Sequence, residues 1–184
     1  MIILIIGGSG CGKSAFAESC IMDLAEPGHE TIYYLATMQV FGEEARKKVE
    51  RHIELRRGKG MRTIEQTKNI DQVVANMEEG LGAVLLEDLG NLVANEMFDV
   101  SSSDGKECPE KIARKICDQL YYLAEKTSHL VIVTNQVFED GIAYEEGTMD
   151  YIRTLGNINR MIAKAADEVV EVIAGIPVMR KRPV

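Results

Sequence analysis

The sequence lacks several features that define particular classes of protein. No apolar run approaches the ~20 residues that a membrane-spanning helix needs. The four cysteines include no CxxC pair, which favours a reduced setting without a metal cluster. Lysine and arginine number 21 against 29 aspartates and glutamates, so the net charge is −8 and binding to nucleic acid through dense positive charge is not expected. We therefore expect a cytoplasmic protein with no membrane span and no nucleic-acid partner.

The chain does have enough apolar side chains for one core. Its 184 residues are 46% hydrophobic, which suits a single compact domain over residues 1–184. The apolar start, Met1–Ile6, has no basic leader and runs into glycines instead of a cleavage site, so we expect a buried strand and not a signal peptide. Val100–Lys106 and Phe138–Met149 are expected to form surface loops.

Strand-like and helix-like segments alternate along the chain. Short apolar runs, typical of buried parallel strands, occur at Met1–Ile6, Thr31–Thr37, Ala83–Leu89, Leu130–Thr134 and Val169–Ala174. Helical patterns lie between them, at Ser14–Leu24, Glu43–Leu55, Asp71–Glu79, Asn91–Met97, Pro109–Lys126 and Asp150–Ala166. Such alternation predicts right-handed βαβ units and an α/β fold, a mostly parallel sheet with helices on both faces.

The strongest local motif follows the first apolar run. It is the segment Gly7-Gly8-Ser9-Gly10-Cys11-Gly12-Lys13-Ser14, which satisfies the phosphate-binding pattern GxxxxGK[ST]. Its glycines let backbone N–H groups turn towards phosphate oxygens, and the following helix adds its positive N-terminal end. Lys13 would reach the β- and γ-phosphates of a nucleoside triphosphate, and the Ser14 hydroxyl would bind Mg²⁺. The motif in this context predicts a P-loop NTPase fold of the RecA-like kind.

A second acidic element should help to hold the magnesium. The apolar segment that begins at Ala83 ends in Glu87 and Asp88, the layout of a Walker B strand. Either carboxylate could reach the ion, directly or through a water molecule, and we take Glu87 as the candidate ligand with Asp88 as its alternative. A plainer interpretation is that these carboxylates are solvated, or that they cap the helix expected near Asn91.

His52 stands in a short basic stretch between residues 46 and 62. Within the expected helix Glu43–Leu55, Lys48 and Arg56 lie four residues to either side of it on the same face. Two cations beside an imidazole favour its neutral, nucleophilic form. A neutral histidine can attack an α-phosphate and hold the nucleotide as a phosphoramidate. The plainer alternative is an ordinary histidine on a solvated, charged helix face.

Several segments, taken in order, resemble those of one protein family. They are Gly7–Ser14, Tyr34–Thr37, Val49–His52, Arg62–Glu65, Leu85–Glu87, Val133–Asn135, Leu155–Asn159, Ala165–Val169 and Ala174–Pro177. Over nearly the whole chain they resemble the adenosylcobinamide kinase/adenosylcobinamide-phosphate guanylyltransferases of cobalamin biosynthesis. Gly10 and Cys11 stand where the loop of that family usually carries arginine and serine.

The resemblance implies two reactions at one site. The chain would phosphorylate the aminopropanol hydroxyl of adenosylcobinamide with ATP or GTP, and would then transfer GMP from GTP to that phosphate. By position, His52 is the histidine that becomes guanylylated. The implied nucleotide contacts are the P-loop, Ala36, Thr37, Met38, Ile53, Glu54, Leu55, Arg56, Glu65 and Glu87. The resemblance also implies a homotrimer.

Two other functions fit the same residues less fully. A divergent relative of that family could keep one activity or act on another phosphorylated alcohol. A regulatory module could use nucleotide hydrolysis at the P-loop as a switch, although a switch has no use for a nucleophile at His52.

Overall fold

A computed structural model of the protein describes residues 1–26, 30–39, 60–77, 82–98, 108–137 and 144–183. Its centre is a seven-stranded sheet in the order β3-β2-β4-β5-β1-β6-β7. The strands are β1 (Ile2–Gly7), β2 (Ile32–Ala36), β3 (Arg62–Glu65), β4 (Ala83–Glu87), β5 (His129–Asn135), β6 (Glu168–Ile173) and β7 (Ile176–Lys181). Neighbouring strands are parallel except β6 and β7, which pair antiparallel. The mostly parallel sheet predicted from the sequence is confirmed.

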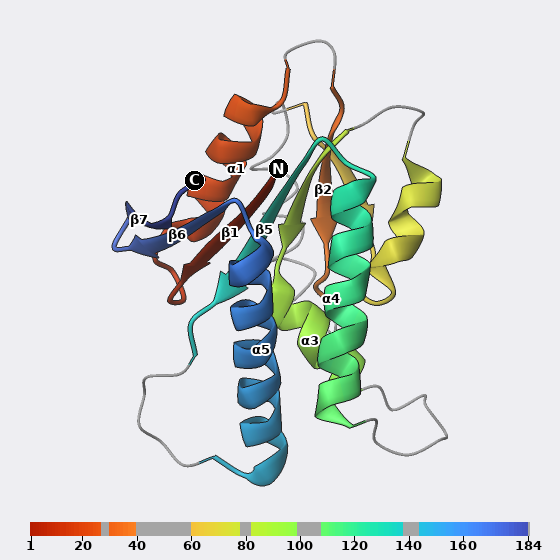
Figure 1. Ribbon diagram of the computed structural model, residues 1–184, viewed down its shortest axis with the longest axis vertical. Coiled ribbons are helices and arrows are strands. Elements are labelled where there is room, and N and C mark those ends of the chain that lie inside the picture. The colour runs from red at the N-terminus through yellow and green to blue at the C-terminus, as the bar shows by residue number, and fades with distance from the viewer. Residues whose placement is uncertain (27–29, 40–59, 78–81, 99–107, 138–143, 184) are drawn as a thin grey trace.

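Helices cover both faces of this sheet. They are α1 (Lys13–Leu24), the 3₁₀ helix η1 (Ile70–Asn76), α3 (Leu89–Met97), α4 (Pro109–Glu125) and α5 (Glu146–Ala165). Figure 1 shows α4 and α5 packed side by side in front of the strands. None of the helices in the described residues is long and apolar enough to cross a membrane.

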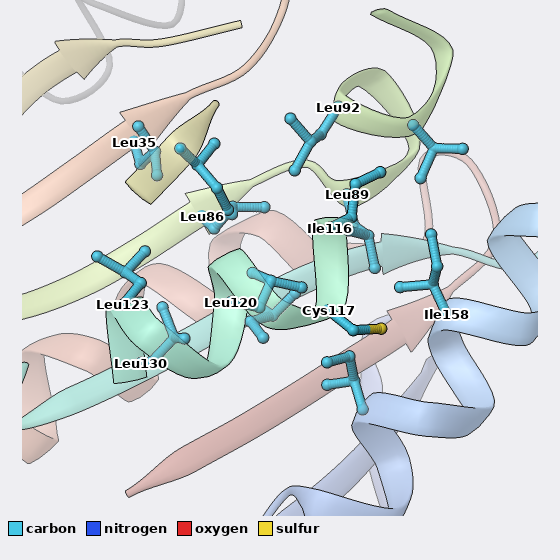
Figure 2. Packing of buried hydrophobic residues seen from close by; sticks show 14 of the residues in the cluster. Leu35, Leu86, Leu89, Leu92, Ile116, Cys117, Leu120, Leu123, Leu130 and Ile158 are labelled. Carbon is cyan, nitrogen blue, oxygen red and sulfur yellow. The ribbon is translucent and has the colours of Figure 1, made fainter. Parts of the chain in front are cut away.

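Two hydrophobic clusters lie on the opposite faces of the sheet. Residues of β1 alternate between them: Leu4 belongs to the cluster beneath α3, α4 and α5, whereas Ile3 and Ile5 belong to the cluster beneath α1. Alternate side chains of a strand point to opposite faces, so a strand covered on both sides reads as one continuous apolar run. Figure 2 shows the first cluster, in which Leu120 of α4 and Ile158 of α5 pack over the strands.

The two edge strands are absent from the sequence-based prediction. The four residues of β3 are mostly exposed and form no apolar run. In β7 the residues are mostly exposed and include Pro177, which is tolerated because an edge strand leaves one row of backbone groups unpaired. An edge strand needs few apolar side chains, and the apolar pattern therefore finds only the five inner strands.

Two expected elements differ from the structure. The α-helix expected over Asp71–Glu79 is a 3₁₀ helix over Ile70–Asn76, in a segment where the β-branched Val73 and Val74 disfavour an α-helix. The prediction of a loop over Phe138–Met149 is wrong at its C-terminal end, because α5 already begins at Glu146. Glycine and threonine in that first turn are weak helix formers and hide the start of the helix. Residues 138–143, the expected loop Val100–Lys106 and the expected helix Glu43–Leu55 lie outside the described residues.

All four cysteines lie in the described part of the chain and are free. Burial raises the pKa of Cys20 and of Cys117 to about 11, so these two thiols stay protonated near neutral pH.

Candidate nucleotide-binding site

The P-loop connects the end of β1 to the start of α1. Gly10 and Gly12 have φ values of 70° and 93°, in the left-handed region that favours glycine. Gly7 is glycine for another reason: a Cβ there would lie 2.6 Å from Cys11 Sγ and 2.7 Å from the carbonyl oxygen of Val172. Three glycines of the motif are therefore required by the turn and its packing.

The turn between β6 and β7 supports the P-loop from outside the motif. The backbone N–H of Gly175 donates to the Cys11 carbonyl at 2.8 Å, and a Cβ on Gly12 would lie 3.4 Å from Gly175 Cα. Ala174 and Gly175 both have positive φ, 49° and 82°. Sequence reasoning gave this turn no part in the site, because a contact so distant in sequence leaves no local pattern.

Lys13 begins α1, and its side chain folds back over the loop. Its Nζ donates to the carbonyl oxygen of Gly8 at 3.0 Å, and only 7% of the residue is exposed. The ammonium is thus held against the first turn of the P-loop, the part of the motif that receives phosphate oxygens.

Ser14 and Glu87 meet although 73 positions separate them in the sequence. Ser14 Oγ donates to Glu87 Oε1 at 2.5 Å. The other oxygen, Oε2, is buried and has no hydrogen-bond partner among the described residues. Burial raises the pKa of Glu87 from 4.5 to about 7; the Ser14 hydrogen bond opposes this rise, the nearby Asp88 adds to it and Lys13 opposes it. A hydroxyl beside a carboxylate with an unpaired oxygen is the donor set that Mg²⁺ prefers.

Asp88 has a different role from its neighbour. Its Oδ1 accepts from the backbone N–H of Asn91 at 2.7 Å and caps α3, and its Oδ2 accepts from Asn135 Nδ2 at 3.2 Å. The peptide bond between Glu87 and Asp88 is cis. The cap that the sequence offered as an alternative for the pair therefore belongs to Asp88, and Glu87 carries the oxygen without a partner.

Thr37 holds the backbone of this acidic segment in place. It is buried, and its backbone N–H donates to the Glu87 carbonyl at 3.1 Å. Its hydroxyl lies 3.1 Å from the same carbonyl and 2.7 Å from that of Asp88. The Thr37 carbonyl accepts in turn from Asn95 Nδ2 at 2.7 Å. Asn95 and Asn135 thus belong to the framework of the site. Asn135 ends one of the segments that carry the family resemblance, whereas Asn95 has no motif around it and gives no sequence signal.

The remaining candidate residues divide into two groups. Ala36 pairs in register with Glu65 on one side and with Glu87 on the other, so these residues share the carboxyl edge of the sheet, and Met38 follows close behind. The second group, His52 and Ile53–Arg56, lies outside the described residues.

Comparison with known proteins gives full-length matches. The family described as "CobU: Cobinamide kinase / cobinamide phosphate guanyltransferase" matches residues 3–179. The chain is 30% identical over 188 residues to the "Bifunctional adenosylcobalamin biosynthesis protein CobU" of Escherichia coli K12, covering 98% of this chain and 100% of that protein. It is 31% identical to the protein of the same name from Salmonella typhimurium, with the same coverage. The corresponding CobP protein of Pseudomonas aeruginosa is 26% identical over 97% of this chain and 96% of its own length.

The fold has relatives of much lower sequence identity. A solved structure of an ATPase domain superposes with a TM-score of 0.51 at 10% identity, covering 92% of this chain and 68% of that one. This likeness supports the P-loop ATPase type of fold and nothing further. Because the family match over residues 3–179 includes both the P-loop and the strand that ends at Glu87, the chain belongs to the cobinamide kinase / cobinamide phosphate guanyltransferase family.

Proposed function

We propose that this chain phosphorylates adenosylcobinamide with a nucleoside triphosphate and then transfers GMP from GTP to the new phosphate, giving adenosylcobinamide-GDP. The observation that carries the proposal is the contact between Ser14 and Glu87 beside the loop-bound Lys13. It occurs in a chain whose full-length relatives are named bifunctional adenosylcobalamin biosynthesis proteins.

The first reaction is a phosphoryl transfer. The hydroxyl oxygen of the alcohol attacks the γ-phosphorus, and the bond from that phosphorus to the β–γ bridging oxygen breaks. The nucleoside diphosphate leaves with the electron pair, and the hydroxyl proton passes to solvent. Lys13 and the backbone N–H groups of the P-loop stabilise the charge on the phosphate oxygens, since such transfers depend mainly on positioning and electrostatics.

Magnesium is the cofactor that these residues would hold. Ser14 Oγ and the Glu87 carboxylate supply hard oxygen donors, and Glu87 Oε2 lacks a partner in the described structure. Mg²⁺ commonly takes one or two protein ligands and fills its other positions with phosphate oxygens and water. The ion would neutralise charge on the β- and γ-phosphates.

The second reaction uses His52 as the nucleophile. An imidazole nitrogen attacks the α-phosphorus of GTP, the bond from that phosphorus to the α–β bridging oxygen breaks, and pyrophosphate leaves. A phosphate oxygen of the phosphorylated corrinoid then attacks the same phosphorus, and the P–N bond breaks to release the histidine. Support for His52 comes from its basic surroundings in the sequence and from the family resemblance.

We assign the nucleotide contacts to the carboxyl edge of β2, β3 and β4. Ala36, Thr37, Met38 and Glu65 lie there with Glu87, and Ile53–Arg56 would complete the set. ATP and GTP remain alternative donors for the first reaction.

A labelling experiment tests the function. Incubation with GTP labelled at the α-phosphate should give an acid-labile covalent adduct that is absent in His52→Ala, and Lys13→Ala should lose phosphate transfer to cobinamide. If the wild type binds nucleotide but forms no adduct, the guanylyltransferase proposal fails, and a relative with one activity or a nucleotide switch becomes the better interpretation.

We further propose one domain over residues 1–184, a homotrimer and a cytoplasmic location. The domain is supported by the position of β1, which lies between β5 and β6 and so ties the two ends of the chain into one sheet. The trimer rests on the resemblance alone, and light scattering coupled to gel filtration tests it.

A further inference from the structure

A cleft of about 910 Å³ opens beside the P-loop. It lies at the carboxyl ends of β5 and β6, on the opposite side of β4 from β2 and β3. Its walls come from the P-loop, the end of β5, the start of α5 and the end of β6 with the turn that follows. The proposed nucleotide contacts on β2 and β3 take no part in it.

One end of the cleft reaches the place where a γ-phosphate would be presented. Gly8 lines the cleft and accepts the hydrogen bond of Lys13 Nζ at 3.0 Å. Gln136 also lines it, and its backbone N–H is fixed to the Gly7 carbonyl at 3.1 Å. The lysine of a P-loop reaches the β- and γ-phosphates, so a molecule in the cleft would have its near end beside the phosphoryl group that moves.

A second wall of the cleft reaches the end of β4, where Glu87 and Asp88 lie. Tyr151 lines the cleft, and its hydroxyl lies 3.4 Å from the carbonyl oxygen of Gly90, which belongs to the first turn of α3. A Cβ on Gly90 would lie only 3.0 Å from that hydroxyl. The cleft therefore touches both the loop that holds Lys13 and the segment that directly follows Glu87.

The size and lining of the cleft suit a bulky amphipathic ligand. Its volume falls at the upper end of the range of small-molecule sites, roughly 300–1,000 Å³. Tyr144 and Ile173 line it and are 39% and 50% exposed, which leaves apolar surface available to a ligand. Glu171 and Thr148 add polar groups to the same walls.

We propose that this cleft is the acceptor site, which holds the alcohol-bearing part of the corrinoid with its hydroxyl turned towards Gly8 and Lys13. The nucleoside of the donor then lies on the other side of β4 from the cleft, at the carboxyl edge of β2 and β3. The assignment rests on the proposed function and adds to it: Tyr144 and Ile173 contact the acceptor and set its affinity, and neither takes part in the transfer of the phosphoryl group.

A matched pair of tyrosines tests the assignment. Tyr144→Ala removes a cleft residue, and Tyr122→Ala removes a tyrosine of nearly equal exposure, 42%, on α4 outside the cleft. The loss of one aromatic wall should raise the KM for cobinamide about tenfold, with the KM for the nucleoside triphosphate unchanged. Tyr122→Ala should leave both values at wild type. Ile173→Asp, at an exposed position, should raise the KM for cobinamide further.

Three outcomes count against the assignment, and they are distinguishable. A wild type that transfers no phosphate to cobinamide refutes the proposed function and the assignment with it. An active wild type whose KM for cobinamide is unchanged in both Tyr144→Ala and Ile173→Asp refutes the assignment alone. A rise confined to the KM for the nucleotide shows that the cleft holds the nucleoside. Urea midpoints equal to that of the wild type establish that each variant is folded.

Discussion

Replacing Glu87 by glutamine should stabilise the ligand-free protein above neutral pH while it abolishes activity. The pKa of Glu87 rises from 4.5 to about 7 on folding, mainly through burial. At a pH between these two pKa values the folded state binds more protons than the unfolded state, so the free energy of unfolding contributed by Glu87 falls as the pH rises. A shift of this size corresponds to about 3 kcal/mol, at 1.36 kcal/mol per pKa unit.

The measurement compares two proteins at two pH values. Urea unfolding of the wild type and Glu87→Gln, followed by circular dichroism, gives the free energy of unfolding at pH 5 and at pH 8. The stability of Glu87→Gln relative to the wild type should increase by about 2–3 kcal/mol between these values, because glutamine carries no charge to bury. Glu125→Gln, on the exposed face of α4, should follow the pH slope of the wild type.

If the free energy of unfolding changed with pH equally in the wild type and in Glu87→Gln, the argument that burial raises the pKa of Glu87 would be refuted. Binding of magnesium and nucleotide gives a second check, because a cation beside Glu87 favours its charged form. The increase in melting temperature caused by magnesium and nucleotide should therefore be larger at pH 8 than at pH 5 in the wild type. In Glu87→Gln this difference should shrink, and phosphate transfer should be lost.

Three further predictions concern the framework. Gly7→Ala should weaken nucleotide binding, since its Cβ would meet the Val172 carbonyl oxygen at 2.7 Å. Gly147→Ala is the control, because it lies in α5 outside the P-loop and its Cβ would meet Phe98 at an ordinary 4.0 Å. Equilibrium dialysis with labelled nucleotide measures both variants. Lys181 Nζ lies within 3.2 Å of three carbonyl oxygens at the end of α5. Lys181→Met should therefore lower the free energy of unfolding in urea by about 1–2 kcal/mol. Lys111→Met, at an exposed position of α4, should lower it less. Leu120→Ala should cost about 2–5 kcal/mol, because this side chain is buried at the centre of the α4 interface; equal stability of that variant and the wild type would contradict the packing.

The sequence predicts the inner part of the fold because local rules apply there. Four of the five inner strands contain a continuous apolar run and β6 is interrupted only by Glu171, and the P-loop is a contiguous motif, so both can be recognised without knowledge of the fold. The edge strands β3 and β7 are mostly exposed and have no such signature. Glu87 and Asp88 carry the same charge at adjacent positions, and only their hydrogen bonds, to Ser14 in one case and to Asn91 and Asn135 in the other, separate their roles.

The acceptor site is better tested by substituting Tyr144 than by substituting the turn between β6 and β7, because of the contacts that this hairpin makes. Val172 limits the space at Gly7, and Gly175 donates to Cys11, so the hairpin supports the P-loop. The same hairpin contributes one wall of the cleft. A substitution at Gly175, which donates directly to the P-loop, should therefore disturb nucleotide and acceptor together and would not separate the two KM values. Tyr144 precedes α5 and lies outside the hairpin, so a change confined to the KM for cobinamide would identify the cleft as the acceptor site.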